Sequence, residues 1–257
     1  MKTLSRLMIL EHPQADGIYY MGTDPIPFGD RAEAHLETDE RSKQCSVIIR
    51  ENPENEKAPY PVAFYLARTN DVDFVFNETF ALQKAYNNCK NNLERNAGST
   101  FMQRYDDSGL SRYLSAYPYS ALLANWRNAK LAKEKKRLRG WNNDNSTKGP
   151  ATKVLVEWMI YGMDYCWSYE IIEDIEKLGI ENTDIAWALI AALIDWKHHY
   201  NLRESKYKEQ KPIYKTVYVS EGGRPVAKKI KLRGINDHEG IDMDLKLGHN
   251  PKLDGFF

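Results

Sequence analysis

The apolar residues of this chain follow a strand-like period first and a helix-like period later, and this order restricts the fold more than any other feature. Runs rich in β-branched and aromatic residues, bounded by Pro, Gly and Asp, predict strands at residues 4–10, 17–21, 45–50, 61–67 and 72–76. From 152 to 167 and from 171 to 178, apolar residues recur every three or four positions, which predicts helices. Strands followed by helices indicate the α+β class.

A further helix is predicted to begin at Asn182 or Thr183, because both residue types are good N-caps. Its apolar residues recur at helical spacing and are predicted to be core: Ile185, Ala186, Leu189, Ile190, Leu193, Ile194 and Trp196. Two more segments, 101–105 and 110–139, are predicted to be helical, and the polar segment 87–98 is predicted to be a loop.

A β-hairpin is predicted near the C-terminus, where Ile213–Val219 and Val226–Arg233 flank a turn that contains two glycines. No internal repeat and no long low-complexity linker divides the sequence, so a single composite domain is expected over 1–257. Its expected parts are a strand-rich portion with a basic helix at 1–140, a helical portion at 150–200, the basic hairpin at 211–234 and a tail at 235–257.

Positive charge is concentrated in two segments of a chain whose formal net charge is zero. Residues 130–139 hold six Lys or Arg against one Glu, and residues 203–233 hold ten against three. Four aromatic residues, Tyr113, Tyr117, Tyr119 and Trp126, precede the first basic segment. Cations beside stackable rings favour a nucleic acid as the ligand, although a solvated helix face is an equally good interpretation of either basic segment alone.

The cysteine content predicts a reducing, cytoplasmic location. The three cysteines, Cys45, Cys89 and Cys166, are far apart and form no CxxC pair, so neither a disulfide framework nor a zinc knuckle is indicated. No apolar run reaches the roughly 20 residues that span a bilayer, and no secretory leader is recognisable, so no membrane partner is expected.

Sequence motifs for catalysis are almost absent. The chain has no phosphate-binding glycine loop, no HExxH and no GxSxG. One alternative stays open, because Asp242, Asp244 and Lys246 form a D-x-D-x-K pattern in which carboxylates of a metal-dependent nuclease bind magnesium and the lysine positions the attacking water. The adjacent His198 and His199 point about 100° apart on a helix, so a shared metal is not expected.

Three short fragments, in the same order, resemble the guide-RNA-binding backbone subunit of the type I-F CRISPR Cascade, the Csy complex, a RAMP protein. The first is Leu4–Tyr20 (LSRLMILEHPQADGIYY), and the second is DVDFVFNETF with the later Tyr86 and Cys89. The third is Arg112-Tyr113-Leu114 followed by Trp126-Arg127-Asn128. The basic hairpin lies where that family carries its thumb.

The resemblance implies an RRM or ferredoxin-like palm with a helical insertion and a β-hairpin thumb. It implies a non-catalytic, crRNA-binding subunit of an antiviral ribonucleoprotein, which holds guide RNA phosphates while the bases pair with target DNA. The expected partners are guide RNA, target DNA and other subunits of the complex, including further copies of this chain along the RNA. No cofactor, metal or catalytic residue is expected. A phage-type mimic or inhibitor of such a complex is a further alternative.

The nucleic-acid-binding residues expected from this resemblance fall into three groups. Tyr113 and Trp126 are assigned to stacking, with core packing as the rival role. The phosphate-binding group is Arg112, Arg127, Lys130, Lys133, Lys135, Lys136, Arg137 and Arg139. The hairpin group is Lys228, Lys229, Lys231 and Arg233.

Overall fold

The computed structural model of the chain describes residues 4–26, 43–69, 71–128, 134, 138–209, 213–221 and 224–232, with side chains no further than residue 205. The chain divides into two compact units, Met1–Arg203 and Glu204–Phe257. Within the described residues, no helix is both long enough and apolar enough to cross a membrane.

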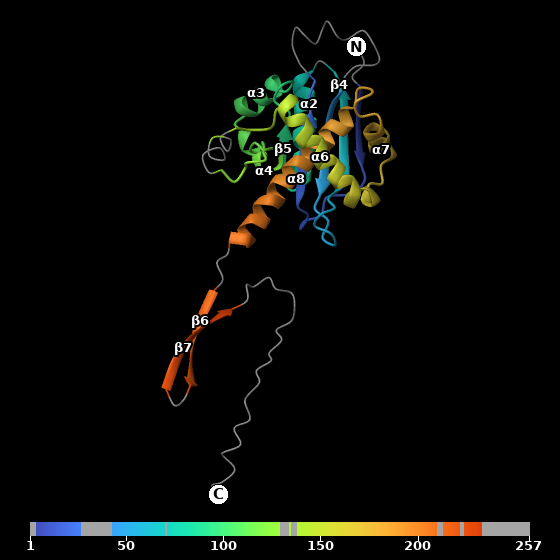
Figure 1. The fold of residues 1–257 in the computed structure, drawn as a ribbon. Helices are drawn as coiled ribbons and strands as arrows, with labels where there is room; N and C mark the ends of the chain where they lie inside the picture. The colour runs from blue at the N-terminus through green and yellow to red at the C-terminus, as the bar shows by residue number, and fades with distance from the viewer. Residues whose placement is uncertain are drawn as a thin grey trace. The chain divides into compact units, whose positions relative to one another are not determined.

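The first unit is built on a mixed five-stranded sheet with the order β1-β4-β3-β2-β5 (Figure 1). Its strands are β1 (Leu4–Ile9), β2 (Tyr19–Asp24), β3 (Gln44–Arg50), β4 (Tyr60–Arg68) and β5 (Lys90–Leu93). Neighbours from β1 to β2 pair antiparallel, whereas β5 pairs parallel to β2. Because β2 and β5 are parallel, their C-terminal ends lie side by side at the same end of the sheet.

Helices cover both faces of this sheet. In chain order they are α2 (Val72–Ala85), α3 (Ser99–Asp107), the 3₁₀ turn η1 (Ser111–Tyr113), α4 (Tyr119–Leu122), α6 (Asn145–Gly162), the 3₁₀ turn η2 (Met163–Tyr165), α7 (Tyr169–Glu176) and α8 (Asp184–Glu209). Val47 and Ile49 of β3 belong to the core formed with α6, α7 and α8, and Ile48 between them belongs to the core formed with α2 and α3. Alternate residues therefore face opposite cores, and every residue of β3 is buried.

The long helix α8 packs directly on β2 at a glycine. A Cβ atom on Gly22 would lie 2.2 Å from both the Ala188 carbonyl oxygen and the Ala192 backbone nitrogen, so a larger residue there would displace the helix. The Asn92 side chain donates a 2.7 Å hydrogen bond to the Ala191 carbonyl oxygen, which attaches the same turn of α8 to β5. Small residues on the helix and glycine on the strand thus set the distance between α8 and the sheet.

The predicted α+β class is confirmed, and the predicted strands over 4–10, 17–21, 45–50 and 61–67 correspond to β1 to β4. The strand predicted at 72–76 is wrong, because these residues form the start of α2. Asp71 accepts a 2.9 Å hydrogen bond from the Phe74 backbone N–H and so caps the helix. Val75, Phe76 and Thr79 are then buried on one helical face.

The loop predicted at 87–98 and the helix predicted at 110–139 are also corrected. Residues 90–93 form β5, whose buried asparagines find partners: Asn91 Nδ2 donates to the Tyr105 hydroxyl (3.3 Å), as Asn92 does to α8. In the described part of 110–139, residues 111–113 form η1, residues 119–122 form α4 and Glu134 is helical, while 114–118 and 138–139 are not. Leu114 bridges to Asn91 and Ala116 to Arg139, so backbone pairing along the sheet edge takes the place of a continuous helix.

The sheet order differs from that of a ferredoxin-like palm. In a βαββαβ palm, the two strands joined through a crossover lie parallel and the sheet interleaves the two halves. Here β2, β3 and β4 are successive antiparallel neighbours, and the parallel pair joins β2 to β5. The expected palm is therefore corrected to a β2-β3-β4 meander in which β5 is added parallel to β2.

The second unit contains the predicted β-hairpin, which the structure confirms as β6 (Ile213–Glu221) and β7 (Arg224–Leu232). Lys228, Lys229 and Lys231 lie opposite Val217, Thr216 and Tyr214 in its antiparallel register.

Asp195 places a carboxyl group in the interior of the first unit, on the sheet side of α8. Its Oδ2 atom accepts a 2.7 Å hydrogen bond from the Ser115 hydroxyl, and its Oδ1 atom has no hydrogen-bond donor among the described residues. Burial raises the pKa of Asp195 to about 7, while the Ser115 hydrogen bond and the Lys90 charge act in the opposite direction. In the folded chain the Asp195 carboxyl is therefore mainly neutral only below about pH 7.

We predict that replacing Gly22 with Ala destabilises the first unit by about 1–3 kcal/mol, because the added methyl group overlaps the α8 backbone. Urea unfolding measures the difference. Gly149→Ala is the matched control, because a Cβ atom on Gly149 would meet no atom within 4 Å. Gly109 is equally open but has a φ of +67°, so an alanine there would be strained. An unchanged stability in Gly22→Ala would contradict the packing described.

We also predict that Asp195 makes the folded state less stable as pH rises. An unfolded aspartate ionises near pH 3.9, so between about pH 4 and pH 7 the folded chain keeps a proton that the unfolded chain has lost. The contribution of the Asp195 carboxyl to the free energy of unfolding is fully present below about pH 4 and is lost as pH rises through about 7. Between pH 5 and pH 8, the free energy of unfolding of Asp195→Asn should therefore fall by roughly 2–3 kcal/mol less than that of the unsubstituted chain. Equal pH dependence of both proteins in urea unfolding would refute this role.

Candidate active site

Two carboxylates lie side by side where β2 and β5 end. The parallel register pairs Thr23 with Leu93, so Asp24 and Glu94 are the next residues on neighbouring strands. The Glu94 backbone N–H donates a 3.1 Å hydrogen bond to the Thr23 carbonyl oxygen, which continues the strand pairing to this point. The side chains of Asp24 and Glu94 are hydrogen-bonded to each other.

A third carboxylate comes from α8. Asp184 is the first residue of this helix and lies one turn before Ala188. Ala188 packs against Gly22, and Gly22 lies two residues before Asp24 on β2. The Asp184 carboxylate is buried and accepts a 2.8 Å hydrogen bond from the Lys43 backbone N–H. The packing of α8 on β2 therefore brings Asp184 to the sheet end that holds Asp24 and Glu94.

Asp174 of α7 adds a fourth negative charge but already has a structural role. Its carboxylate accepts a 2.7 Å hydrogen bond from the Ala186 backbone N–H and a second one from Ile185. These N–H groups belong to the first turn of α8 and have no partner within the helix. Asp174 thus stabilises the start of α8, beside Asp184.

The electrostatics of the cluster favour either a shared proton or a bound cation. Burial, followed by the negative charges of Glu94 and Asp184, raises the pKa of Asp24 well above its usual range. Burial also raises the pKa of Glu94, against hydrogen bonds from Asp24 and Asn143 and the positive charge of Lys148. Two carboxyl groups in hydrogen-bond contact do not both ionise unless a positive charge lies between them.

The donor atoms of the cluster suit a hard divalent cation such as Mg²⁺ or Mn²⁺, because all are carboxylate oxygens. In the described residues, no three His, Cys, Asp or Glu side chains are spaced to hold an ion as they stand. Asp24 and Glu94 instead face each other across their shared hydrogen bond. Loss of the shared proton frees oxygens on both side chains, so these two residues could hold a cation, with Asp184 as the third ligand.

Residues around Glu94 keep the loop after β5 in place. The Arg95 backbone N–H donates a 2.8 Å hydrogen bond to the Trp141 carbonyl oxygen. The Trp141 backbone N–H donates a 3.0 Å hydrogen bond to the Leu93 carbonyl oxygen. Asn143 Nδ2 donates to Glu94 Oε2 (3.3 Å). A Cβ on Gly98 would lie 2.3 Å from the Glu94 carbonyl oxygen, so this glycine is required for the tight return of the loop.

The aromatic residues expected to stack on bases are engaged by the protein. The Tyr113 ring packs edge-on against Phe80 with 5.2 Å between ring centroids, and the Arg112 guanidinium lies 5.0 Å from its centroid. Trp126 is half-buried against the core, with Arg127 5.3 Å from its ring. Both rings therefore pack against the protein, and their stacking on bases stays a prediction.

Half of the expected cationic contacts lie outside the described residues: Lys130, Lys133, Lys135, Lys136, Arg137 and Arg233. The backbone of Lys228, Lys229 and Lys231 is described, but their side chains are not, and Asp242, Asp244 and Lys246 also lie outside. Arg112, Arg127 and Arg139 are described and exposed. Arg139 is two residues before Trp141, at the strand end that leads to Glu94.

Asp24, Glu94 and Asp184 are absent from the site residues expected from the sequence. Asp24 follows a predicted strand and Asp184 follows a predicted N-cap, so each was near a recognised boundary. Glu94 was assigned to a loop because β5 is rich in asparagine. A carboxylate close behind a predicted strand was an available signal for Asp24 alone.

No protein-family model and no curated protein sequence matches this chain. Among solved structures it is similar to the large terminase nuclease of thermophilic phage G20c, in a zinc-bound form (11% identity, 72% of this chain and 85% of that chain covered, TM-score 0.46) and a magnesium-bound form (11%, 73% and 86%, 0.47). It is also similar to the large terminase nuclease domain of Thermus phage P74-26 (11%, 72% and 83%, 0.44).

These comparisons correct the function expected from the sequence. All three similar structures are nuclease domains, and none of the three is a subunit of a CRISPR complex. The expectation of a non-catalytic, crRNA-binding Cascade subunit in antiviral defence, and of a chain that is not an enzyme, is therefore wrong.

We predict that Asp24→Asn stabilises the metal-free protein and removes its response to divalent cations. The substitution removes a carboxylate from a crowded acidic cluster, so the unfolding temperature without metal should rise by roughly 2–4 °C, equivalent to about 1 kcal/mol. Mg²⁺ or Mn²⁺ should raise the unfolding temperature of the unsubstituted chain but not of the variant. Thermal scans with EDTA or excess cation measure both effects.

The matched control is Asp164→Asn, because this aspartate is exposed and outside the cluster. It should show the same cation response as the unsubstituted chain. A cation response that survives in Asp24→Asn would show that the ion binds elsewhere.

Proposed function

We propose that the first unit is a metal-dependent nuclease whose cation-binding residues are Asp24, Glu94 and Asp184. The observation that supports this proposal is the contact of two carboxylates at adjacent strand ends, with a third brought beside them by α8. The phage terminase domains described above are nucleases. The proposal for this chain rests on its own carboxylates.

The proposed roles follow from the surroundings of each residue. Asp24 and Glu94 would hold the cation, because they are in direct contact, and Asp184 would complete the ligand set from α8. A bound divalent cation supplies Lewis-acid activation of a phosphodiester and of the attacking water. Asp174 and Lys43 act as positioning residues: the first caps α8, and the second holds the Asp184 carboxylate through its backbone N–H.

Phosphate attraction would come from cations near Glu94. Lys148 acts on the Glu94 carboxylate from α6, and its ammonium group lies 5.6 Å from the Trp187 ring centroid. The described end of the basic segment, Leu138–Trp141, is hydrogen-bonded to Ser115 and Leu93 beside the same strand end. A polyanionic backbone is the substrate class that this combination of acidic centre and basic surroundings fits.

A cytoplasmic location is also proposed. Cys45, Cys89 and Cys166 are buried free thiols, which suits a reducing compartment.

The direct test is cleavage of duplex DNA, single-stranded DNA and RNA by the full chain with Mg²⁺ or Mn²⁺. Asp24→Asn, Glu94→Gln and Asp184→Asn should each lower the rate at least about a hundredfold, and EDTA should abolish cleavage. Asp164→Asn is the matched control and should cleave normally.

Asp244→Ala separates this proposal from the alternative based on the D-x-D-x-K pattern. Normal cleavage by Asp244→Ala with loss in Asp24→Asn supports the buried cluster. The reverse result would move the active centre to the C-terminal pattern, and cleavage that persists in EDTA would reject both.

A further inference from the structure

An aromatic pocket lies at the end of the sheet opposite the acidic cluster. Its volume is about 350 Å³, and its lining residues are Leu10, Glu11, Asn52, Pro53, Glu54, Tyr60, Pro61, Tyr165 and Trp167. Because β3 runs antiparallel to β2, Cys45 lies opposite Asp24 and Arg50 lies opposite Tyr19. Asn52 comes just after Arg50, so the pocket is separated from Asp24 by the length of the strand.

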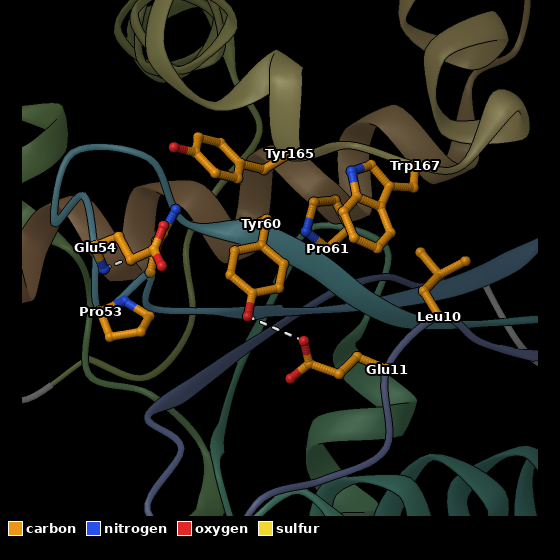
Figure 2. Close-up of a pocket in the computed structure, with 9 residues that line it drawn as sticks. Leu10, Glu11, Pro53, Glu54, Tyr60, Pro61, Tyr165 and Trp167 are labelled. Atoms are coloured by element: carbon orange, nitrogen blue, oxygen red, sulfur yellow. Dashed lines mark hydrogen bonds between the residues drawn. The ribbon is translucent and has the colours of Figure 1, made fainter.

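Rings make up much of the pocket lining, because Pro53, Tyr60, Pro61, Tyr165 and Trp167 all belong to it. Figure 2 shows Tyr60 between Pro53 and Glu54 on one side and Pro61, Trp167 and Leu10 on the other, with Tyr165 beyond it. The Tyr60 and Tyr165 ring centroids are 6.4 Å apart. Trp167 is 83% exposed, which is unusual for the largest apolar side chain.

Tyr60 is held in place by a charged pair at the base of the pocket. Its hydroxyl donates a 3.0 Å hydrogen bond to Glu11 Oε2, and the Arg50 guanidinium donates a 2.6 Å hydrogen bond to Glu11 Oε1. Glu11 is thereby neutralised, and the Tyr60 ring is fixed before any ligand arrives. A rigid aromatic anchor of this kind loses little conformational entropy on binding.

The remaining polar groups attract a cation and a carbonyl oxygen. Glu54 is exposed and forms no ion pair with the described residues, so its charge is available at one end of the pocket. Asn52 Oδ1 accepts the Glu54 backbone N–H at 3.0 Å, and Asn52 Nδ2 has no acceptor among the described residues. Pro53 and Pro61 have no N–H, so the wall lacks the row of donors that adding a β-strand would need.

We propose that this pocket binds a proline-rich, basic segment of a partner protein in the polyproline II conformation. Such a segment carries unpaired carbonyl oxygens and flat pyrrolidine rings, and grooves lined by aromatic side chains bind it through these features. Rings at Tyr60, Tyr165 and Trp167 provide the stacking surface, and Glu54 selects an adjacent arginine or lysine. The pocket is independent of the proposed nuclease centre and serves as an attachment point for a second protein.

The test is isothermal titration calorimetry of the full chain with an acetylated and amidated peptide of Pro-Pro-Arg repeats. Trp167→Ala should weaken binding about tenfold or more, because one buried aromatic contact is worth at least about 1.4 kcal/mol. Tyr169→Ala, a neighbouring exposed aromatic outside the pocket, should bind within about twofold of the unsubstituted chain.

Charge is tested by a second matched pair. Glu54→Lys should weaken binding of the Pro-Pro-Arg peptide about fivefold or more, whereas Glu56→Lys, on the same loop but outside the pocket, should change it little. A Pro-Pro-Glu peptide and an Ala-Ala-Arg peptide should both bind more weakly than the Pro-Pro-Arg peptide.

Four results would overturn the proposal: no binding of the Pro-Pro-Arg peptide, equal binding of the acidic or alanine peptide, no effect of Trp167→Ala, or no effect of Glu54→Lys. If a single-stranded oligonucleotide binds instead and loses affinity in Trp167→Ala, the pocket is a nucleic-acid site. Circular dichroism of each variant confirms that it is folded.

Discussion

The contact between α8 and β2 is the constraint on which the rest of the first unit depends. Gly22 presents no side chain to the helix, and Ala188, Ala191 and Ala192 present only backbone and methyl groups, so two main chains meet almost without intervening atoms. This contact fixes where α8 begins relative to the ends of β2 and β5. A buried acidic cluster then follows from chain geometry, because Asp24 and Asp184 are close to the contact along their own elements.

The molecule offsets the cost of burying these carboxylates with fixed hydrogen bonds around them. The Asp184 carboxylate receives a backbone N–H, Glu94 receives an amide from Asn143, and Asp174 receives two N–H groups at the start of α8. Asp24 and Glu94 also have each other as partners, and burial raises the pKa of both carboxyl groups. A carboxylate kept in such surroundings is typical of a site whose natural occupant is positive.

Much of the fold could be predicted from the sequence, whereas the site could not. The strands with β-branched residues and the hairpin follow local patterns, as do α6, α7 and α8. Residues 72–76 were mistaken for a strand because Val72, Phe74 and Phe76 also alternate, and the cap at Asp71 was overlooked. Strand β5 was overlooked because Asn91 and Asn92 are stabilised by partners about 14 and 99 residues away, which no local pattern contains.

The functional error had a similar origin. The aromatic and basic residues of 110–141 form a conspicuous group in the sequence, and in the structure Tyr113 packs against Phe80 while Trp126 lies half-buried against the core. The carboxylates, in contrast, are single residues in three separate segments. Only the parallel register of β2 and β5 and the course of α8 bring them together.

The separation of these carboxylates along the chain also has a consequence for the growing polypeptide. Asp24 and Glu94 leave the ribosome long before Asp184, and α8, which supplies Asp184, also covers one face of the sheet. A nascent chain that ends before α8 has neither the third carboxylate nor a closed core, so the cluster is completed only after most of the first unit has been synthesised and folded. The acidic centre is thus absent from incomplete chains.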